Sequence, residues 1–310
     1  MIELMHKLPD SFFDSEYRQI LVDGKMKEIW AVELDLLSEF DRICRKRDIK
    51  YSLAYGTLLG AVRHGGFIPW DNDVDVIMLR DEYQKLRSCA EEFSAPYFLQ
   101  NEDTDYLACR GHAQLRNTQT TGILRSEMKS GKAVYTYNQG IFLDIFVLDE
   151  VPLEPDERKY FFGEVAHLKR KVLRIKRHIG AYQARSRMKM PFRKVVNGMF
   201  VGLKDKILKQ NSLKKLEKEL ESLCSRYRGR SDTLVAPIMF SPRIAEKECY
   251  PREIFEDLIE VEFEHLPFKA VRRYDEILTQ KYGNWHKHVV GGDFHGGVLF
   301  DVNRAYSEYL

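Results

Sequence analysis

The stretch Tyr51–Leu79, YSLAYGTLLGAVRHGGFIPWDNDVDVIML, joins a turn to a group of carboxylates and decides the fold of the chain. Its first five residues are apolar enough for a short strand, which Gly56 and Thr57 end, and Leu58–Arg63 has the apolar spacing of a short helix. The turn therefore lies at a helix N-terminus, where unpaired backbone N–H groups, the Thr57 hydroxyl and the helix dipole attract phosphate oxygens. This pattern predicts a phosphate-binding turn.

Acidic and apolar residues alternate downstream of that turn, at Asp73, Val74, Asp75 and Val76. On a strand this alternation places both carboxylates on one face. Because like charges repel at short distance, a shielded pair of carboxylates indicates a cation between them. Carboxylate oxygens suit Mg²⁺, or Mn²⁺, with a substrate phosphate completing the ligand shell. The alternative is that both acids lie on the solvated face of an edge strand.

The string GTLLGAVRHGGFIPWDNDVDV, residues 56–76, resembles the signature of the LicD family of phosphotransferases, which includes phosphocholine transferases and the fukutin-related proteins. The resemblance implies a nucleotidyltransferase-like fold, a phosphate-binding turn at Gly56 and Thr57, and a metal pair at Asp73 and Asp75. Asn72 stands where many members carry another Asp, so we do not count it as a ligand.

Three further residues of this string are candidates for substrate binding. Arg63 and His64 are candidates for stabilising charge on the transferred phosphoryl group. Trp70 either stacks on a base or faces a quaternary ammonium group by cation–π attraction, or it is a packed core residue.

Arg116 and Asp144 extend the predicted site beyond this string. An Arg followed by a Thr-containing turn also occurs in the family, which makes Arg116 a candidate phosphate clamp, because a guanidinium group matches phosphate geometry. The alternative is a surface Arg on a hairpin.

Asp144 lies in the apolar run GIFLDIFVL, residues 140–148, where a buried carboxylate needs a partner. We therefore predict a third carboxylate of the same site, as a metal ligand or as the acceptor of a proton, and the alternative is an Asp on an open strand face.

The composition is that of an ordinary globular protein, with 310 residues, 44% hydrophobic and 31% charged residues and a formal net charge of +2. This charge gives no reason to expect a nucleic-acid partner. Five scattered cysteines form neither a zinc motif nor a disulfide framework, which indicates a reducing compartment. No window approaches the ~20 apolar residues that span a bilayer. We expect a cytoplasmic protein without a transmembrane anchor.

The pattern predicts an α/β (α+β) fold with a mixed sheet, divided into a catalytic core at 1–150, a basic helical insertion at 151–230 and a C-terminal completion at 231–310. Pro152 and Pro155 mark the first boundary, and Gly180 and Pro191 are predicted breaks between helices. Residues 168–210 hold fourteen Lys and Arg against one acid. They suit peripheral contact with anionic lipid, with a polyanionic acceptor or with RNA, or they pack on the core with solvated charges.

The residues alone predict a phosphate and a metal, and the resemblance to the LicD family implies an enzyme that moves a phospho-alcohol group, phosphocholine first of all, from a donor such as CDP-choline or CDP-ribitol to a hydroxyl group. The acceptor would be a cell-surface glycan, lipopolysaccharide or teichoic acid precursor. One alternative is a nucleotidyltransferase that moves a nucleoside monophosphate from a nucleoside triphosphate. The other is a non-enzymatic relative that binds membranes or RNA.

Overall fold

Strand β10, Ile141–Pro152, is the centre of the fold, and all 12 of its residues are buried. In the computed structural model, which describes residues 4–108, 111–187, 211–289 and 297–310, β10 belongs to a six-stranded mixed sheet. The sheet order is β3-β4-β10-β6-β5, with β11 paired to the far end of β10. Only β4 and β10 run parallel, whereas the other neighbours are antiparallel. The predicted α+β class is confirmed.

The sheet strands are β3 (Ser52–Leu53), β4 (Asp75–Leu79), β5 (Tyr97–Gln100), β6 (Ala113–Asn117), β10 and β11 (Thr233–Ala236). Two-stranded ribbons are formed by β1 (Glu16–Tyr17) with β2 (Ile20–Leu21), β7 (Thr121–Leu124) with β14 (Val298–Asp301), β8 (Met128–Lys129) with β9 (Lys132–Ala133), and β12 (Leu258–Phe263) with β13 (Leu266–Val271). The described residues include the α-helices α1 (Gly24–Lys46), α2 (Tyr55–His64), α3 (Arg80–Ser88), α4 (Pro155–Arg187), α6 (Pro242–Lys247) and α7 (Tyr274–Tyr282). Residues 211–224 form a further helix.

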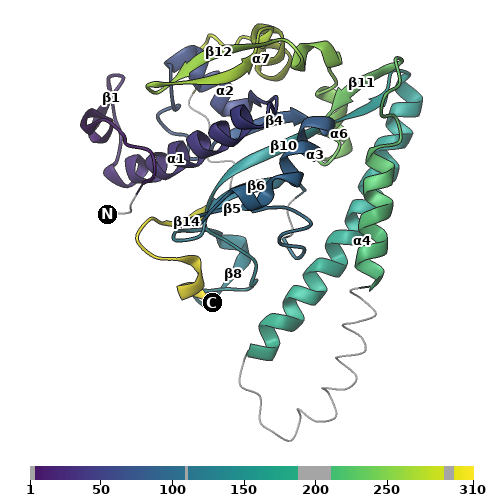
Figure 1. Cartoon of the computed structure of the whole chain (residues 1–310), viewed down its shortest axis with the longest axis horizontal. Coiled ribbons are helices and arrows are strands. Elements are labelled where there is room, and N and C mark those ends of the chain that lie inside the picture. The colour runs from purple at the N-terminus through teal and green to yellow at the C-terminus, as the bar shows by residue number, and fades with distance from the viewer. Residues whose placement is uncertain (1–3, 109–110, 188–210, 290–296) are drawn as a thin grey trace, which may run out of the picture.

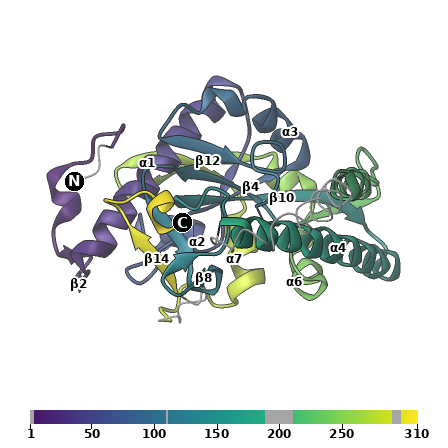
Figure 2. The ribbon, with the colours of Figure 1, turned by 90° about the horizontal axis from the view of Figure 1, so that it is seen from below.

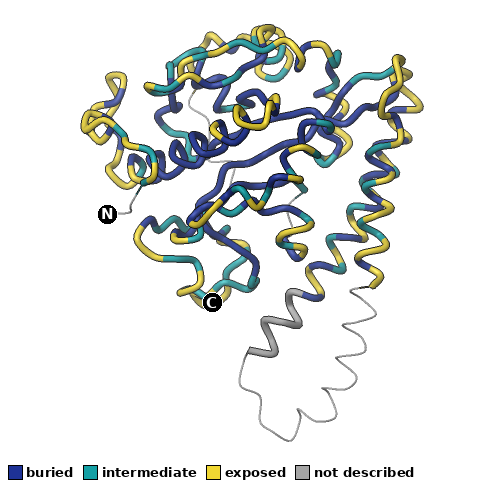
Figure 3. The backbone as a smooth tube through the Cα atoms, in the orientation of Figure 1, coloured by how far each residue is buried: buried dark blue, intermediate teal, exposed yellow. Residues whose placement is uncertain are grey.

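The core lies between the sheet and the helices that cover it. Helix α1 packs against β10 and β6, and α3 and α4 also contact β10. Figure 3 shows the buried backbone of α1, β4 and β10 as the continuous centre of the molecule. Because β4 and β10 are covered on both faces, most of their residues are apolar. The acids in these strands, Asp75, Asp144, Asp149 and Glu150, are buried as well.

Helix α2 begins earlier than the sequence predicts. The expected strand Tyr51–Tyr55 is only β3, Ser52–Leu53, and the helix begins at Tyr55. Gly56 and Thr57 therefore lie inside the first turn of α2 and not in a loop before it. The helix ends at Gly65, whose φ of 67° is the left-handed conformation that glycine adopts without steric cost.

Helix α4 and the 211–224 helix form an antiparallel arm at one side of the sheet (Figures 1 and 2). Their buried leucines and valines make a second apolar cluster with residues of β10 and β11. Helix α4 continues through Gly180, so the predicted break there is wrong, and Pro191 lies outside the described residues. Pro152 ends β10 and Pro155 begins α4, as predicted. The division into three domains stays a prediction.

Two further properties concern only the described part of the chain. The four cysteines there, Cys44, Cys89, Cys224 and Cys249, are free thiols. None of the helices there is both long and apolar enough to cross a membrane.

Candidate active site

Asp75 and Asp144 face each other across two neighbouring strands. Asp75 is the first residue of β4, Asp144 is its register partner on the parallel strand β10, and the Asp144 amide donates to the carbonyl oxygen of Val74 (2.9 Å). Register partners on adjacent strands place their side chains on the same face of the sheet. Asp73, Asp75 and Asp144 are only 8%, 8% and 6% exposed. The two strands thus bring distant parts of the sequence to one buried acidic site.

The electrostatics of Asp75 show that further acids lie nearby. Burial raises the pKa of Asp75 well above its usual range, and the charges of Asp73, Asp144 and Asp71 raise it further. A fourth carboxylate, Asp71, therefore belongs to the cluster. Negative charge concentrated in this way favours a cation or a proton at the site.

Glu33 adds a carboxylate from α1 that sequence reasoning missed. It is 1% exposed, and its Oε2 atom has no hydrogen-bond partner among the described residues. Burial, followed by the charges of Asp73, Asp71 and Asp144, raises its pKa well above the usual value. The surroundings of Glu33 therefore favour a proton or a nearby cation over a bare carboxylate.

The first turn of α2 lies against these acids. The Thr57 hydroxyl oxygen accepts a hydrogen bond from the Asp75 amide (2.8 Å), which fixes the turn to the start of β4. The first intrahelical bond is made by the Leu58 amide, so the amides before it have no partner within the helix. A Cβ atom on Gly56 would lie 2.5 Å from the Oδ2 atom of Asp71, so any side chain at this position would displace the Asp71 carboxylate. The predicted phosphate-binding turn therefore lies next to the predicted carboxylates.

Tyr55, Glu248 and Lys281 form one polar group beside the turn. Tyr55 has a φ of 48°, a left-handed conformation that costs a non-glycine residue about 1 kcal/mol. Its hydroxyl donates to Glu248 (3.0 Å), and Lys281 Nζ lies 2.6 Å from the same carboxylate and 3.9 Å from the centroid of the Tyr55 ring. The charge of Lys281 acts to lower the pKa of Asp75. Helix α7 thus supplies a cation to the acidic site.

Tyr282, the next residue of α7, also lies near the carboxylates. Burial raises the pKa of its phenol, and the charges of Asp75, Asp71, Glu248 and Asp73 add to that shift. The side chain is still 40% exposed. A partly exposed aromatic ring therefore lies near the acidic site.

Two side chains hold the Asp144 carboxylate. His112 Nε2 lies 3.0 Å from Asp144 Oδ1, and the Gln114 amide donates to the same oxygen (2.5 Å). Gln114 is the register partner of Asp144 on β6. The orientation of Asp144 is thus set by β6 as well as by β10.

Arg116 is buried, so the surface alternative for it is wrong, and its role as a phosphate clamp stays a prediction. Its side chain is 0% exposed, and its guanidinium group donates to Gln100 Oε1 (2.6 Å), to the Gly140 carbonyl (2.6 Å) and to Gln114 Oε1. Because Gln114 in turn donates to Asp144, Arg116 supports the carboxylate through Gln114. It is a positioning residue.

Arg63, His64 and Trp70 gather at the opposite end of α2, about 9 Å along the helix axis from Thr57 at 1.5 Å per residue. Arg63 donates to the Trp285 carbonyl (3.1 Å), and the ring centroid of His64 lies 6.5 Å from that of Trp70. Burial, then Arg63, His288 and Arg18, lowers the pKa of His64 to about 4. His64 is therefore neutral at pH 7 and does not supply the positive charge expected of it.

Known proteins are similar to this chain, both over the residues of the candidate site and over most of its length. A family model described as LicD/FKTN/FKRP, nucleotidyltransferase domain, matches residues 48–150. The lipopolysaccharide cholinephosphotransferase LicD of Haemophilus influenzae is 30% identical over 268 residues, which are 84% of this chain and 91% of that enzyme. An uncharacterized protein of Rickettsia prowazekii is 30% identical over 98 residues, 31% of this chain and 35% of that protein.

The chain belongs to the LicD family. This finding confirms the resemblance seen in residues 56–76. Membership identifies the chain as a transferase of phosphorus-containing groups. The acids Asp71, Asp73 and Asp75 lie inside the part of the chain that the family model matches, as does Asp144.

The donor atoms of this LicD-family site fit a divalent cation. In the described part of the chain, no three His, Cys, Asp or Glu side chains already surround one point at which a metal ion would be held. Mg²⁺ does not need such a cage, because it usually binds one or two carboxylates, several waters and the substrate phosphates. Asp75 and the neighbouring carboxylates repel one another, and the Oε2 atom of Glu33 has no hydrogen-bond partner among the described residues. Both features favour a bound cation.

Proposed function

We propose that this chain moves phosphocholine from CDP-choline to a hydroxyl group of a lipopolysaccharide or a related cell-surface glycan. The similarity to the Haemophilus enzyme over 91% of that protein supports the phosphocholine group and the acceptor class. The observation that carries the proposal is the pairing of Asp75 with Asp144 beside the first turn of α2. It supports the proposal because carboxylate oxygens suit Mg²⁺ and the amides of a helix N-terminus suit phosphate.

In this reaction the acceptor oxygen forms a bond to the phosphorus of phosphocholine. The bond from that phosphorus to the bridging oxygen breaks, CMP leaves with the electron pair, and the proton of the acceptor hydroxyl passes to a carboxylate of the site or to water. Mg²⁺, held by Asp73, Asp75 and Asp144, would neutralise charge on the diphosphate. The amides at the start of α2 bind phosphate oxygens, and Lys281 offsets negative charge. Tyr282 provides an exposed ring for the quaternary ammonium group.

Isothermal titration of the purified protein with CDP-choline, CDP-ribitol, CTP and ATP, each with and without Mg²⁺, tests the donor. We expect CDP-choline to bind selectively and only with Mg²⁺. Preference for CDP-ribitol would change the transferred group. Preference for CTP or ATP would favour nucleotidyl transfer, and no binding by a folded sample would contradict the enzymatic proposal.

We further propose that the arm rests on an anionic membrane surface. Along α4 an exposed stripe of basic side chains recurs at helical spacing, formed by His167, Arg170, Lys171, Arg174, Arg177 and His178. Residues 188–210, the remainder of the predicted basic segment, lie outside the described residues. Each Lys or Arg near an anionic surface contributes about 1 kcal/mol of attraction.

Sedimentation with vesicles that contain phosphatidylserine tests this contact. The intact protein should bind them at low salt, and the double variant Arg170→Glu and Arg174→Glu should bind at least tenfold more weakly. Vesicles of phosphatidylcholine alone serve as the control. Equal binding of the variant to the anionic vesicles would contradict the proposal.

A further inference from the structure

A cavity of about 120 Å³ lies between the central sheet and the arm. Its walls are formed by β5 and β6 residues on one side, by α4 and the 211–224 helix on the other, and by Met239. We propose that this cavity binds an anionic group of the acceptor, a phosphate or a carboxylate, through the side chain of Lys169. The inference rests on the proposed function, because it assigns the binding site of the second substrate.

The cavity adjoins the carboxylate site. His112 lines the cavity, and the same imidazole lies 3.0 Å from Asp144. Gln100, which also lines the cavity, accepts from Arg116 in the group that supports Asp144. A group bound in the cavity is therefore separated from Asp144 only by side chains that touch or support it. This geometry suits a substrate whose anionic group is anchored there while a neighbouring hydroxyl reaches the carboxylates.

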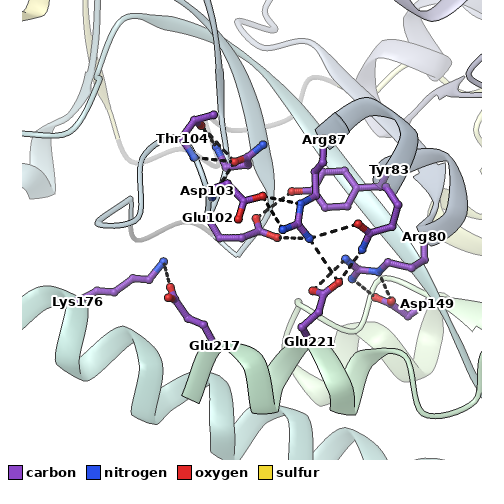
Figure 4. A network of polar contacts seen from close by, with 12 residues as sticks. Arg80, Tyr83, Arg87, Glu102, Asp103, Thr104, Asp149, Lys176, Glu217 and Glu221 are labelled. Atoms are coloured by element: carbon purple, nitrogen blue, oxygen red, sulfur yellow. Dashed lines mark hydrogen bonds and ion pairs between the residues drawn. The ribbon is translucent and has the colours of Figure 1, made fainter. Parts of the chain in front are cut away.

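Most cations around the cavity already have carboxylate partners, as Figure 4 shows. Arg80 binds Asp149 through two hydrogen bonds (2.6 and 2.9 Å), and Lys176 lies 2.9 Å from Glu217. Arg87 nearby binds Asp103 (2.6 Å). These pairs neutralise each other and are poor candidates for binding an anion.

Lys169 differs from these residues. Among the described residues its ammonium group has no carboxylate partner and donates to the backbone carbonyl of Met239. Burial lowers its pKa, because a desolvated ammonium group loses hydration that one carbonyl does not replace. An anion in the cavity would supply the missing charge.

The space beside Lys169 is kept open by Gly111. A Cβ atom at that position would lie 2.7 Å from Lys169 Nζ, so any side chain there would displace the amine. The cavity volume equals that of a few water molecules, at about 30 Å³ each. It accommodates a single phosphate or carboxylate group and not a whole sugar nucleotide, which favours the anchor of a larger acceptor.

The test compares the wild-type protein with Lys169→Met, which keeps the length of the side chain and removes its charge. Lys159→Met is the matched control, because Lys159 lies on the same helix, is exposed and is not part of the basic stripe. Each protein is titrated with inorganic phosphate and, separately, with acetate. We expect Lys169→Met to lose one phosphate or acetate site or to weaken it at least tenfold, whereas Lys159→Met should match the wild type. The anion that binds more tightly identifies the acceptor group.

A kinetic measurement separates this inference from the proposed function. Lys169→Met should raise the KM for lipopolysaccharide about tenfold and leave the KM for CDP-choline unchanged. If the wild type transfers phosphocholine but Lys169→Met matches it in both KM values and in anion binding, the inference is overturned and the function stands. If the wild type transfers nothing, the proposed function fails, and the anion titration alone then decides whether the cavity is a binding site.

Discussion

At the scale of single residues, the surroundings of His64 lower the pKa of its imidazole. Its Nε2 atom is buried without a hydrogen-bond partner among the described residues, and the cations Arg63 and Arg18 lie close enough to lower its pKa further. The folded protein therefore resists protonation of this imidazole down to a pH of about 4. The unfolded chain binds that proton near pH 6.5.

This difference predicts acid sensitivity. Between pH 6.5 and about 4 the unfolded state holds a proton that the folded state lacks, so stability falls as the pH falls through this window. His64→Gln removes the effect. We expect it to be more stable than the wild type at pH 4.5 by about 1 kcal/mol, less than full linkage gives because the side chain is partly exposed. Urea unfolding at pH 7 and pH 4.5 measures the gap, and a gap of the same size at both values would contradict the account.

Single residues also show which parts of the site could be predicted from the sequence. Asp144 was predictable, because an acid within an apolar run must have a partner. Arg116 was not, because its three acceptors come from β5, β6 and the residue before β10 and leave no local pattern. Lys27 likewise resembles a solvated residue in the sequence, yet it is 2% exposed with its ammonium 4.1 Å from the centroid of the Tyr17 ring.

At the scale of elements, one buried ion pair fixes α3 to β10. Arg80 begins α3, Asp149 lies near the end of β10, and their side chains are 6% and 0% exposed. Asp149 lies inside the strand, which continues to Pro152. The pair joins α3 to β10 next to the arm (Figure 4).

Breaking this pair should lower the free energy of unfolding. Arg80→Met leaves the Asp149 carboxylate buried without its counter-ion, and we expect a loss of about 3–5 kcal/mol in the free energy of unfolding. The double variant Arg80→Met with Asp149→Leu should recover most of that loss, because it also removes the unpaired charge. Arg272→Met is the control, since Arg272 and its partner Asp257 are 60% and 54% exposed and such pairs contribute about 1 kcal/mol or less. Equal losses for Arg80→Met and Arg272→Met in urea unfolding would refute this explanation.

Elements with strong local signals were predicted well, and their ends less well. The strand β5, Tyr97–Gln100, has such a signal, since Pro96 precedes it and the polar residues 101–105 follow it. The start of α2 was misplaced because Tyr55 adopts a left-handed conformation that its neighbours in the fold stabilise. The Gly180 signal for a break was overridden in α4, since glycine in a helix costs only about 1 kcal/mol and the packed arm outweighs it.

At the scale of the whole molecule, the candidate site is assembled from elements far apart in the sequence. Glu33 of α1, Asp75 of β4, Asp144 of β10 and Lys281 of α7 interact across the fold. The motif around Asp73 and Asp75 identified the family and the centre of the site. Glu33, His112 and Lys281 could not be found in the same way, because their roles depend on tertiary contacts that carry no local pattern.

The central claim is that the carboxylates across β4 and β10 support transfer of phosphocholine. The most direct measurement is the rate of CMP release and of phosphocholine incorporation into lipopolysaccharide by the wild type and by Asp75→Asn, with Mg²⁺ present and with circular dichroism to verify folding. We expect equal amounts of CMP and modified glycan from the wild type, and a rate lower by about three orders of magnitude or more in the folded variant. A folded Asp75→Asn protein that works within tenfold of the wild-type rate would contradict the claim.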